Sequence, residues 1–149
     1  MPQLQFEIKR FNELSTTELY HLLQLRAEVF IVEQNCVYQD IDGKDYKALH
    51  LIGTFDGKIV AYSRLFNAGD YFDNASIGRV VIAAAFRDRK WGHDLVQAAI
   101  SAIEHHFGTT RITISAQLYL KKFYEVNGFE AVSDTYLEDN IPHIEMLKN

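Results

Sequence analysis

The residues best suited to chemistry lie between a buried strand and a long helix, in segment 80–94, which reads VVIAAAFRDRKWGHD. Main-chain N–H groups in the first turn of a helix lack partners within the helix, and the helix dipole makes that end partly positive. Arg87, Arg89 and Lys90 add positive charge there, and Gly92 would let the main chain approach an anion because it has no Cβ. The pattern favours a phosphate-binding turn. The alternative is a cluster of basic residues that contacts only water.

Other polar residues form groups that can be compared with known kinds of site. Asp40, Asp42 and Asp45 lie in one acidic loop, but its glycine stands at the wrong place for a calcium-binding loop and no bidentate glutamate follows. Two interpretations stay open, an exposed turn or a site that holds a cationic amine. His105 and His106 are expected at an exposed helix end, and no metal site is predicted.

The composition limits the class of protein. The chain has 149 residues, of which 48% are hydrophobic and 23% charged, and these values are ordinary for a globular protein. No linker, repeat or low-complexity run is found, so one domain over residues 1–149 is expected. The formal net charge of -5 disfavours nucleic-acid binding and is compatible with a cationic substrate.

The single cysteine and the N-terminal sequence bear on the compartment. Cys36 cannot form an internal disulfide or a thiolate zinc site, and we expect it to be a small packed side chain. The N-terminal sequence MPQLQFEIKR lacks the apolar run of a signal peptide, and no later segment could span a bilayer. We therefore expect a cytoplasmic protein without a membrane partner.

The basic turn must be positioned by the elements around it. Ser15 and Glu18 are spaced as a capping box, Asp56-Gly57 predicts a hairpin between two apolar runs, and Gly108 can end a long amphipathic helix. The elements are expected in the order β-α-β-β-β-α-β-α-β-β. Their ranges are 4–8, 15 to about 32, 49–55, 59–65, 76–83, 90–107, 111–116, 118–126, 129–136 and 141–147. This order predicts an α/β (α+β) fold with a mixed, mostly antiparallel sheet of about seven strands flanked by helices.

Two motifs resemble those of a known family. RDRKWG at 87–92 is similar to the pyrophosphate loop of GNAT-superfamily N-acetyltransferases, with Lys90 in the place of the first glycine. FYEVNGF at 123–129 is similar to the Tyr-x-x-x-Gly-Phe element of that superfamily. Finer agreement with the ElaA-like branch is found in LRAEVFIVEQNC (25–36), YQDIDG (38–43), IGRV (77–80) and IPH (141–143). The chain thus resembles an ElaA-like GNAT protein over nearly its whole length.

The resemblance implies a fold, a co-substrate and a reaction. In a single GNAT domain, strands four and five would splay apart to admit acetyl-CoA. A neutral primary amine of a small molecule or peptide would attack the thioester carbonyl directly, without an acyl-enzyme. Acetyl-CoA would be held by Val80, Val81, Ile82, Arg87, Asp88, Arg89, Lys90, Trp91, Gly92, His93 and Gln117.

The resemblance also suggests catalytic residues. Tyr124 matches the family position that donates a proton to the departing CoA thiolate, and the alternative is a tyrosine packed on a helix face. The proton acceptor is open, because residues 75–82 contain no carboxylate of the kind that some relatives use as a base. Glu33, His50 and His143 are the candidates, although a lone histidine in a strand is more often a hydrogen-bonded structural residue.

Two other functions fit the same fold. A non-catalytic module would bind an acyl-CoA or another nucleotide only as a ligand. An interaction protein could form a homodimer, with Tyr71 and Phe72 as exposed anchors. Thiol release from acetyl-CoA that depends on an amine would distinguish an enzyme from both.

Overall fold

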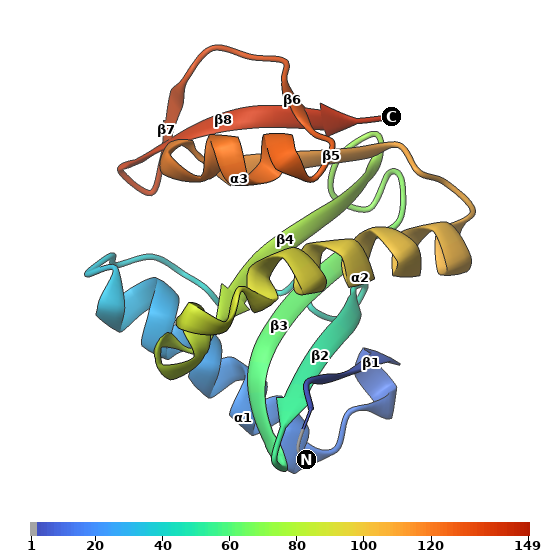
Figure 1. The fold of residues 1–149 in the computed structure, drawn as a ribbon, viewed down its shortest axis with the longest axis vertical. Coiled ribbons are helices and arrows are strands. Elements are labelled where there is room, and N and C mark those ends of the chain that lie inside the picture. The colour runs from blue at the N-terminus through green and yellow to red at the C-terminus, as the bar shows by residue number, and fades with distance from the viewer. Residues whose placement is uncertain (1–2) are drawn as a thin grey trace.

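The computed structural model describes residues 3–149, so Met1 and Pro2, with which the expected domain begins, lie outside the described residues. Within these residues, eight strands form one sheet in the order β1-β2-β3-β4-β5-β8-β6, and β7 pairs with β8 (Figure 1). The strands are β1 (Gln5–Arg10), β2 (Leu49–Phe55), β3 (Lys58–Phe66), β4 (Ala75–Ile82), β5 (Ile112–Gln117), β6 (Glu130–Ala131), β7 (Tyr136–Glu138) and β8 (Ile141–Lys148).

In residues 3–149, three α-helices and four other helical segments connect the strands. They are α1 (Thr16–Arg26), α2 (Trp91–Phe107), α3 (Lys121–Val126), the π-helix η2 (Ala27–Glu33) and the 3₁₀ turns η1 (Phe11–Glu13), η3 (Ala84–Arg89) and η4 (Leu118–Leu120). No helix in residues 3–149 is long and apolar enough to cross a membrane.

Several element ends follow from local sequence signals. The Ser15 hydroxyl accepts a hydrogen bond from the Glu18 N–H at 3.0 Å, and the Glu18 carboxylate accepts one from the Ser15 N–H at 2.8 Å. The predicted capping box is therefore confirmed. Asp56 and Gly57 have φ values of 51° and 78°, as a tight hairpin between β2 and β3 requires. The long helix α2 ends at Gly108, which has a φ of 69°.

The C-terminal region differs from the prediction. The single strand expected over 129–136 is wrong, because the structure has two short strands, β6 and β7, that both pair with β8. Ala131 pairs with Met146 and Tyr136 with His143, so four residues lie between the two pairs on one side and two on the other. The extra residues loop out and divide the strand. The helix expected over 118–126 begins as the 3₁₀ turn η4 and continues as α3.

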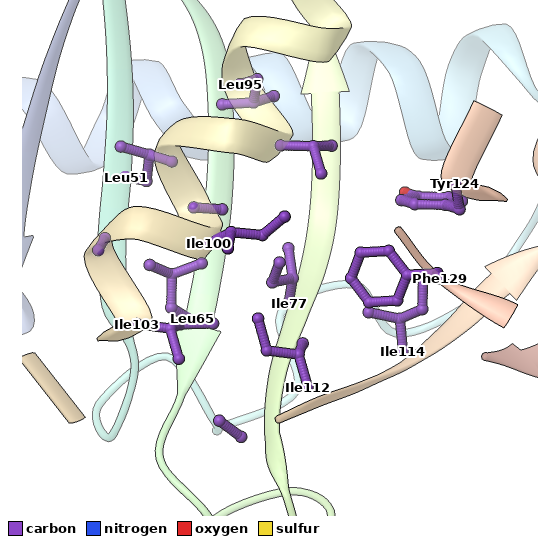
Figure 2. Close-up of a cluster of buried hydrophobic side chains, with 14 of the residues drawn as sticks. Leu51, Leu65, Ile77, Leu95, Ile100, Ile103, Ile112, Ile114, Tyr124 and Phe129 are labelled. Atoms are coloured by element: carbon purple, nitrogen blue, oxygen red, sulfur yellow. The ribbon is translucent and has the colours of Figure 1, made fainter. Parts of the chain in front are cut away.

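Helices cover both faces of the sheet (Figure 1). Leu51 of β2 belongs to the apolar cluster that contains Leu95 of α2, whereas the next residue, Ile52, belongs to the cluster that contains Leu22 of α1. Successive strand residues point to opposite faces, so α1 and α2 lie on opposite sides. Figure 2 shows the cluster on the α2 side, which also includes Tyr124 of α3.

Strands β4 and β5 separate along their length, as the resemblance implied (Figure 1). They run parallel and pair only at Ala75 with Ile112 and at Ser76 with Thr113. Beyond these pairs, β4 continues to Ile82 and β5 to Gln117 without a shared ladder. The main-chain groups of β4 that face β5 after Ser76 therefore lack a strand partner, and buried groups of this kind need another one. The predicted mixed fold with a splayed sheet is confirmed.

Candidate active site

A cavity of about 490 Å³ lies where β4 and β5 separate. Its walls include residues 76–82 of β4 and 114–117 of β5, together with Glu33 at the end of η2, Gly92 in the first turn of α2, and Tyr124 of α3. Segments that are far apart in the sequence thus meet around one space. The splay of the sheet creates this space because no ladder hydrogen bonds close it.

The strand β4 is irregular where it borders the cavity. Ser63 of β3 stands opposite two β4 residues, Arg79 and Val80, and this arrangement is a β-bulge. Arg79 has a φ of 51°, a left-handed conformation that is unfavourable for a residue with a Cβ. Its guanidinium donates a hydrogen bond to the Asp40 carboxylate at 2.7 Å, which holds the bulge from outside the sheet. The bulge directly precedes Val81 and Ile82 and changes the direction of the main chain beside the cavity.

The first turn of α2 has hydrogen-bond donors without side-chain partners. Lys90 is the N-cap residue, with a φ of 61°, and no side chain caps the helix. The first N–H groups of this 17-residue helix are therefore free to bind an anion. A Cβ on Gly92 would lie 3.3 Å from the ring of Phe123, so a side chain here would narrow the approach to the turn. These features fit a diphosphate.

Arg87 lies on the cavity wall with its guanidinium already bonded. Its Nε donates to the carbonyl oxygen of Ile82 at 3.1 Å, and both terminal nitrogens donate to the carboxylate of Glu33. The Arg87 and Glu33 side chains are 42% and 41% exposed. Glu33, a candidate base from the sequence, is thus the ion-pair partner of the loop that is expected to bind phosphate.

Several residues expected to bind the co-substrate have side chains off the cavity wall. These residues are Asp88, Arg89, Lys90, Trp91 and His93. The Arg89 guanidinium lies 4.9 Å from the ring centroid of Phe55 and 5.2 Å from those of Phe86 and Trp91. The Nδ1 atom of His93 is 3.1 Å from the side-chain nitrogen of Asn127, which can donate to it. Besides the Arg87 side chain, this segment therefore offers main-chain groups to a phosphate.

The remaining expected co-substrate contacts lie on the wall. Val80, Val81, Ile82 and Gln117 all border the cavity. The side-chain nitrogen of Gln34, which follows η2, donates to the side-chain oxygen of Gln117 at 3.3 Å. This contact joins the segment after η2 to the end of β5 across the splay.

Tyr124 is buried, and its side chain lies in the apolar cluster of Figure 2 while also bordering the cavity. Its hydroxyl makes no hydrogen bond to another residue of the described chain, and it is not among the fully enclosed unpaired atoms of residues 3–149. Burial raises the pKa of the Tyr124 hydroxyl well above its ordinary value. A protonated hydroxyl that opens on the cavity can donate a proton or a hydrogen bond there.

Of the two candidate histidines, His143 lies on the cavity wall. Its Nδ1 is 2.7 Å from the carbonyl oxygen of Ile141, so Nδ1 must carry the proton in this contact. In the neutral ring, Nε2 then has the lone pair, and it lies 3.5 Å from the Glu138 carboxylate. This tautomer can accept a proton at Nε2.

His50 lies outside the cavity wall and has no exposed surface. Its Nε2 is 2.9 Å from the main-chain oxygen of Asp45 and its Nδ1 is 2.6 Å from the Tyr62 hydroxyl. Both ring nitrogens are therefore engaged, and burial lowers the pKa of the imidazole. The geometry is that of a hydrogen-bonded structural histidine.

The acidic loop is part of a buried ion-pair network. Arg26 donates to Asp40 at 3.0 Å and to Asp45 at 2.8 Å, and Arg64 donates to Asp42 at 2.6 Å and to Asp45 at 3.1 Å. Both interpretations from the sequence are wrong, because these carboxylates are neither an exposed turn nor available to a cationic amine. The arginines come from α1 and β3, and no local pattern indicates that they reach this loop.

Sequence reasoning missed the carboxylates at the turn between β7 and β8. Glu138 and Asp139 border the cavity, and the Ser115 hydroxyl of β5 donates to Glu138 at 3.1 Å. Asp139 and Asn140 have φ values of 52° and 63°, which is the conformation of a tight hairpin turn. The Asp-Asn pair was the available signal, since both residues tolerate that conformation better than most.

The chain matches known proteins over nearly its whole length. A family model described as an acetyltransferase (GNAT) domain matches residues 14–149. ElaA of Escherichia coli K12 is 40% identical over 147 residues, which cover 97% of this chain and 96% of ElaA. The chain belongs to the GNAT acetyltransferase family and to its ElaA-like branch.

Solved structures agree with this membership. The crystal structure of Escherichia coli ElaA matches with a TM-score of 0.92 and 38% identity, over 99% of this chain and 100% of that one. The crystal structure of an acyl-CoA N-acyltransferase from Pseudomonas aeruginosa matches with a TM-score of 0.92 and 42% identity, over the same shares. Family and fold together support acyl transfer from an acyl-CoA as the general class of activity.

Proposed function

We propose that this protein transfers the acetyl group of acetyl-CoA to the primary amine of a small molecule or peptide, and that residues 1–149 act as one catalytic domain. The observation that carries the proposal is the cavity in the splay of β4 and β5. Its walls combine the uncapped start of α2, main-chain groups of β4 without a strand partner, and the buried Tyr124.

The donor would be held chiefly by the main chain. The N–H groups of the first turn of α2, with Arg87, suit a diphosphate, because the helix dipole and the guanidinium both favour negative charge. Val80 to Ile82 would supply hydrogen-bonding groups to the pantetheine arm, since this side of β4 has no ladder. Gln117 faces them from β5.

The reaction we propose is direct attack within a ternary complex. The amine nitrogen attacks the thioester carbonyl carbon, the C–N bond forms, and the C–S bond breaks. The hydroxyl of Tyr124 gives its proton to the departing thiolate, and the proton of the amine passes to Nε2 of His143, directly or through water. His143 suits this role because its Nδ1–H is bonded to a carbonyl, which leaves Nε2 as the acceptor, and the Glu138 carboxylate can stabilise the imidazolium.

The test is thiol release from acetyl-CoA with a panel of primary amines, with CoA binding measured in parallel by calorimetry. We expect release that depends on the amine and saturates with it, together with formation of the acetylated amine. A non-catalytic module would bind CoA but release thiol at the same rate with and without amines. That second result would contradict the proposal.

A further inference from the structure

Apart from Gln117, the C-terminal strands β5, β7 and β8 supply cavity residues on the α1 face of the sheet that the proposed donor site does not use. Ile114 and Ala116 of β5 belong to the apolar cluster on the α2 face, so Ser115 and Gln117 between them point to the α1 face. His143 pairs with Gln117, and Tyr136 of β7 pairs with His143. The C-terminal strands therefore present a row of polar groups to this face.

The charges on this side of the cavity are unbalanced. Arg64 and Arg79 border it, but carboxylates of the acidic loop neutralise both. Glu138 has no lysine or arginine within ion-pair distance among residues 3–149; its neighbours are the Ser115 hydroxyl at 3.1 Å and His143 at 3.5 Å. The Glu138 side chain is 45% exposed. A ligand that enters here meets a negative charge that still lacks a cation.

An aromatic wall lies at the same cavity. Tyr71 stacks on Phe66 with 5.1 Å between the ring centroids and meets Phe72 edge-on at 4.9 Å. All three rings border the cavity. The expectation that Tyr71 and Phe72 are exposed anchors is wrong for Phe72, which is half-buried in this wall. The ammonium of Lys44 lies 5.7 Å from the centre of the Tyr71 ring, so this ring already attracts a cation.

We propose that this part of the cavity takes a protonated primary amine with an aromatic or other apolar body and no carboxylate beside the nitrogen. The inference rests on the acetyl transfer proposed above. The ammonium would lie at Glu138 and would lose one proton to water to become the neutral nucleophile. The next proton of the nitrogen would pass to the Nε2 of His143 during the attack, and the body would contact Tyr71 and Phe72. In an α-amino acid, the carboxylate is attached to the carbon that bears the nitrogen, so it would lie close to the Glu138 carboxylate. Repulsion between these two negative charges would oppose binding strongly.

The test compares acceptors that differ only in that carboxylate. Phenethylamine is measured against phenylalanine, and tyramine against tyrosine, at saturating acetyl-CoA. We expect kcat/KM to favour the decarboxylated member of each pair by about 10- to 100-fold. Glu138→Gln should raise the KM for phenethylamine and reduce the ratio of kcat/KM between phenethylamine and phenylalanine. Glu104→Gln, on the exposed side of α2, removes the same charge elsewhere and should change neither that KM nor that ratio.

A second variant tests the aromatic wall. Tyr71→Ala should lower kcat/KM for phenethylamine toward the value for ethylamine, because the ring that contacts the body is lost. Equal use of phenylalanine, or an unchanged preference in Glu138→Gln, would overturn the inference and leave acetyl transfer intact.

The outcome in which no amine is acetylated would contradict the proposed function, and direct binding then decides the inference. Phenethylamine and phenylalanine are titrated into the CoA-bound protein by calorimetry. The inference holds if phenethylamine binds, phenylalanine does not, and Glu138→Gln weakens that binding. It fails if both bind equally or neither binds.

Discussion

Glu33→Gln removes the carboxylate that holds Arg87 at the edge of the cavity, and we expect it to strengthen the binding of CoA. Both terminal nitrogens of Arg87 donate to Glu33, and its Nε donates to the carbonyl of Ile82. Neither edge of the guanidinium is free to form two hydrogen bonds with one phosphate. A diphosphate must therefore displace Glu33, whose negative charge also repels it.

The size of the effect follows from the exposure of the pair. The Arg87 and Glu33 side chains are 42% and 41% exposed, so solvent screens their attraction. Ion pairs of this kind are worth about 0.2–1 kcal/mol, which corresponds to a decrease in the Kd for CoA of about 1.4- to 5-fold. Added salt should reduce the difference between the variant and the wild type, because it screens both the pair and the repulsion.

Calorimetric titration with CoA measures this effect, and Glu28→Gln is the matched control. Glu28 is exposed on the same segment η2, and its substitution removes the same charge. The Kd of the Glu28→Gln variant for CoA should therefore stay close to that of the wild type. Weaker binding in Glu33→Gln would refute the reasoning, because Glu33 would then orient Arg87 for the phosphate. A loss of kcat by about 10²- to 10⁴-fold with unchanged CoA affinity would instead identify Glu33 as the base.

Three further predictions concern the turn, the proposed acid and the ion-pair network. Gly92→Val should weaken CoA binding at least about tenfold, because even a Cβ at this position lies 3.3 Å from the Phe123 ring. The thermal midpoint should show that the variant is folded, and wild-type affinity for CoA would contradict the phosphate site. Tyr124→Phe should lower kcat by about 10²- to 10⁴-fold with little change in CoA affinity, and near-normal kcat when chemistry limits the rate would exclude the acid role. Asp42→Asn should make the free energy of unfolding fall less steeply below about pH 4.

The sign of the last prediction follows from the environment of Asp42. Partial burial is the largest single influence and opposes ionisation. Hydrogen bonds from the Arg64 guanidinium and the Lys44 N–H, with the charges of Arg64 and Arg79, together outweigh it and hold the pKa of Asp42 well below its usual range. A carboxyl with a lowered folded-state pKa contributes stability above its unfolded pKa, and this contribution is lost as the pH falls toward the folded value. Denaturant unfolding between pH 7 and pH 3 measures the free energy of unfolding of the variant and of the wild type. Equal slopes of this free energy against pH in the two proteins would contradict the prediction.

The turn before α2 could be predicted from the sequence because its signals are local. A buried strand, basic residues and Gly92 follow one another within a few positions, and the start of the helix comes from the periodicity of the residues after them. The left-handed conformation of Lys90 was not indicated by its residue type and became visible only in the structure. Tyr124 was found through the family motif, not through its surroundings.

The features that were missed depend on contacts between distant segments. Arg26 and Arg64 lie on α1 and β3, and each reaches carboxylates of one loop across the fold. Such pairing has no period along the chain, so the acidic loop could not be recognised as neutralised. The same holds for Glu138, which reaches the cavity because the strand expected over 129–136 is divided and β7 forms a hairpin with β8.

The central claim is that an acetyl group passes directly from CoA to an amine in this cavity. A single-turnover reaction with acetyl-CoA labelled with ¹³C at the carbonyl, followed by NMR and by mass spectrometry of the intact protein, tests it most directly. We predict that the thioester signal is replaced by an amide signal of the acceptor as thiol appears, while the protein mass stays unchanged. An acetylated protein, for example at Cys36, or release of labelled acetate without an amide would contradict the account.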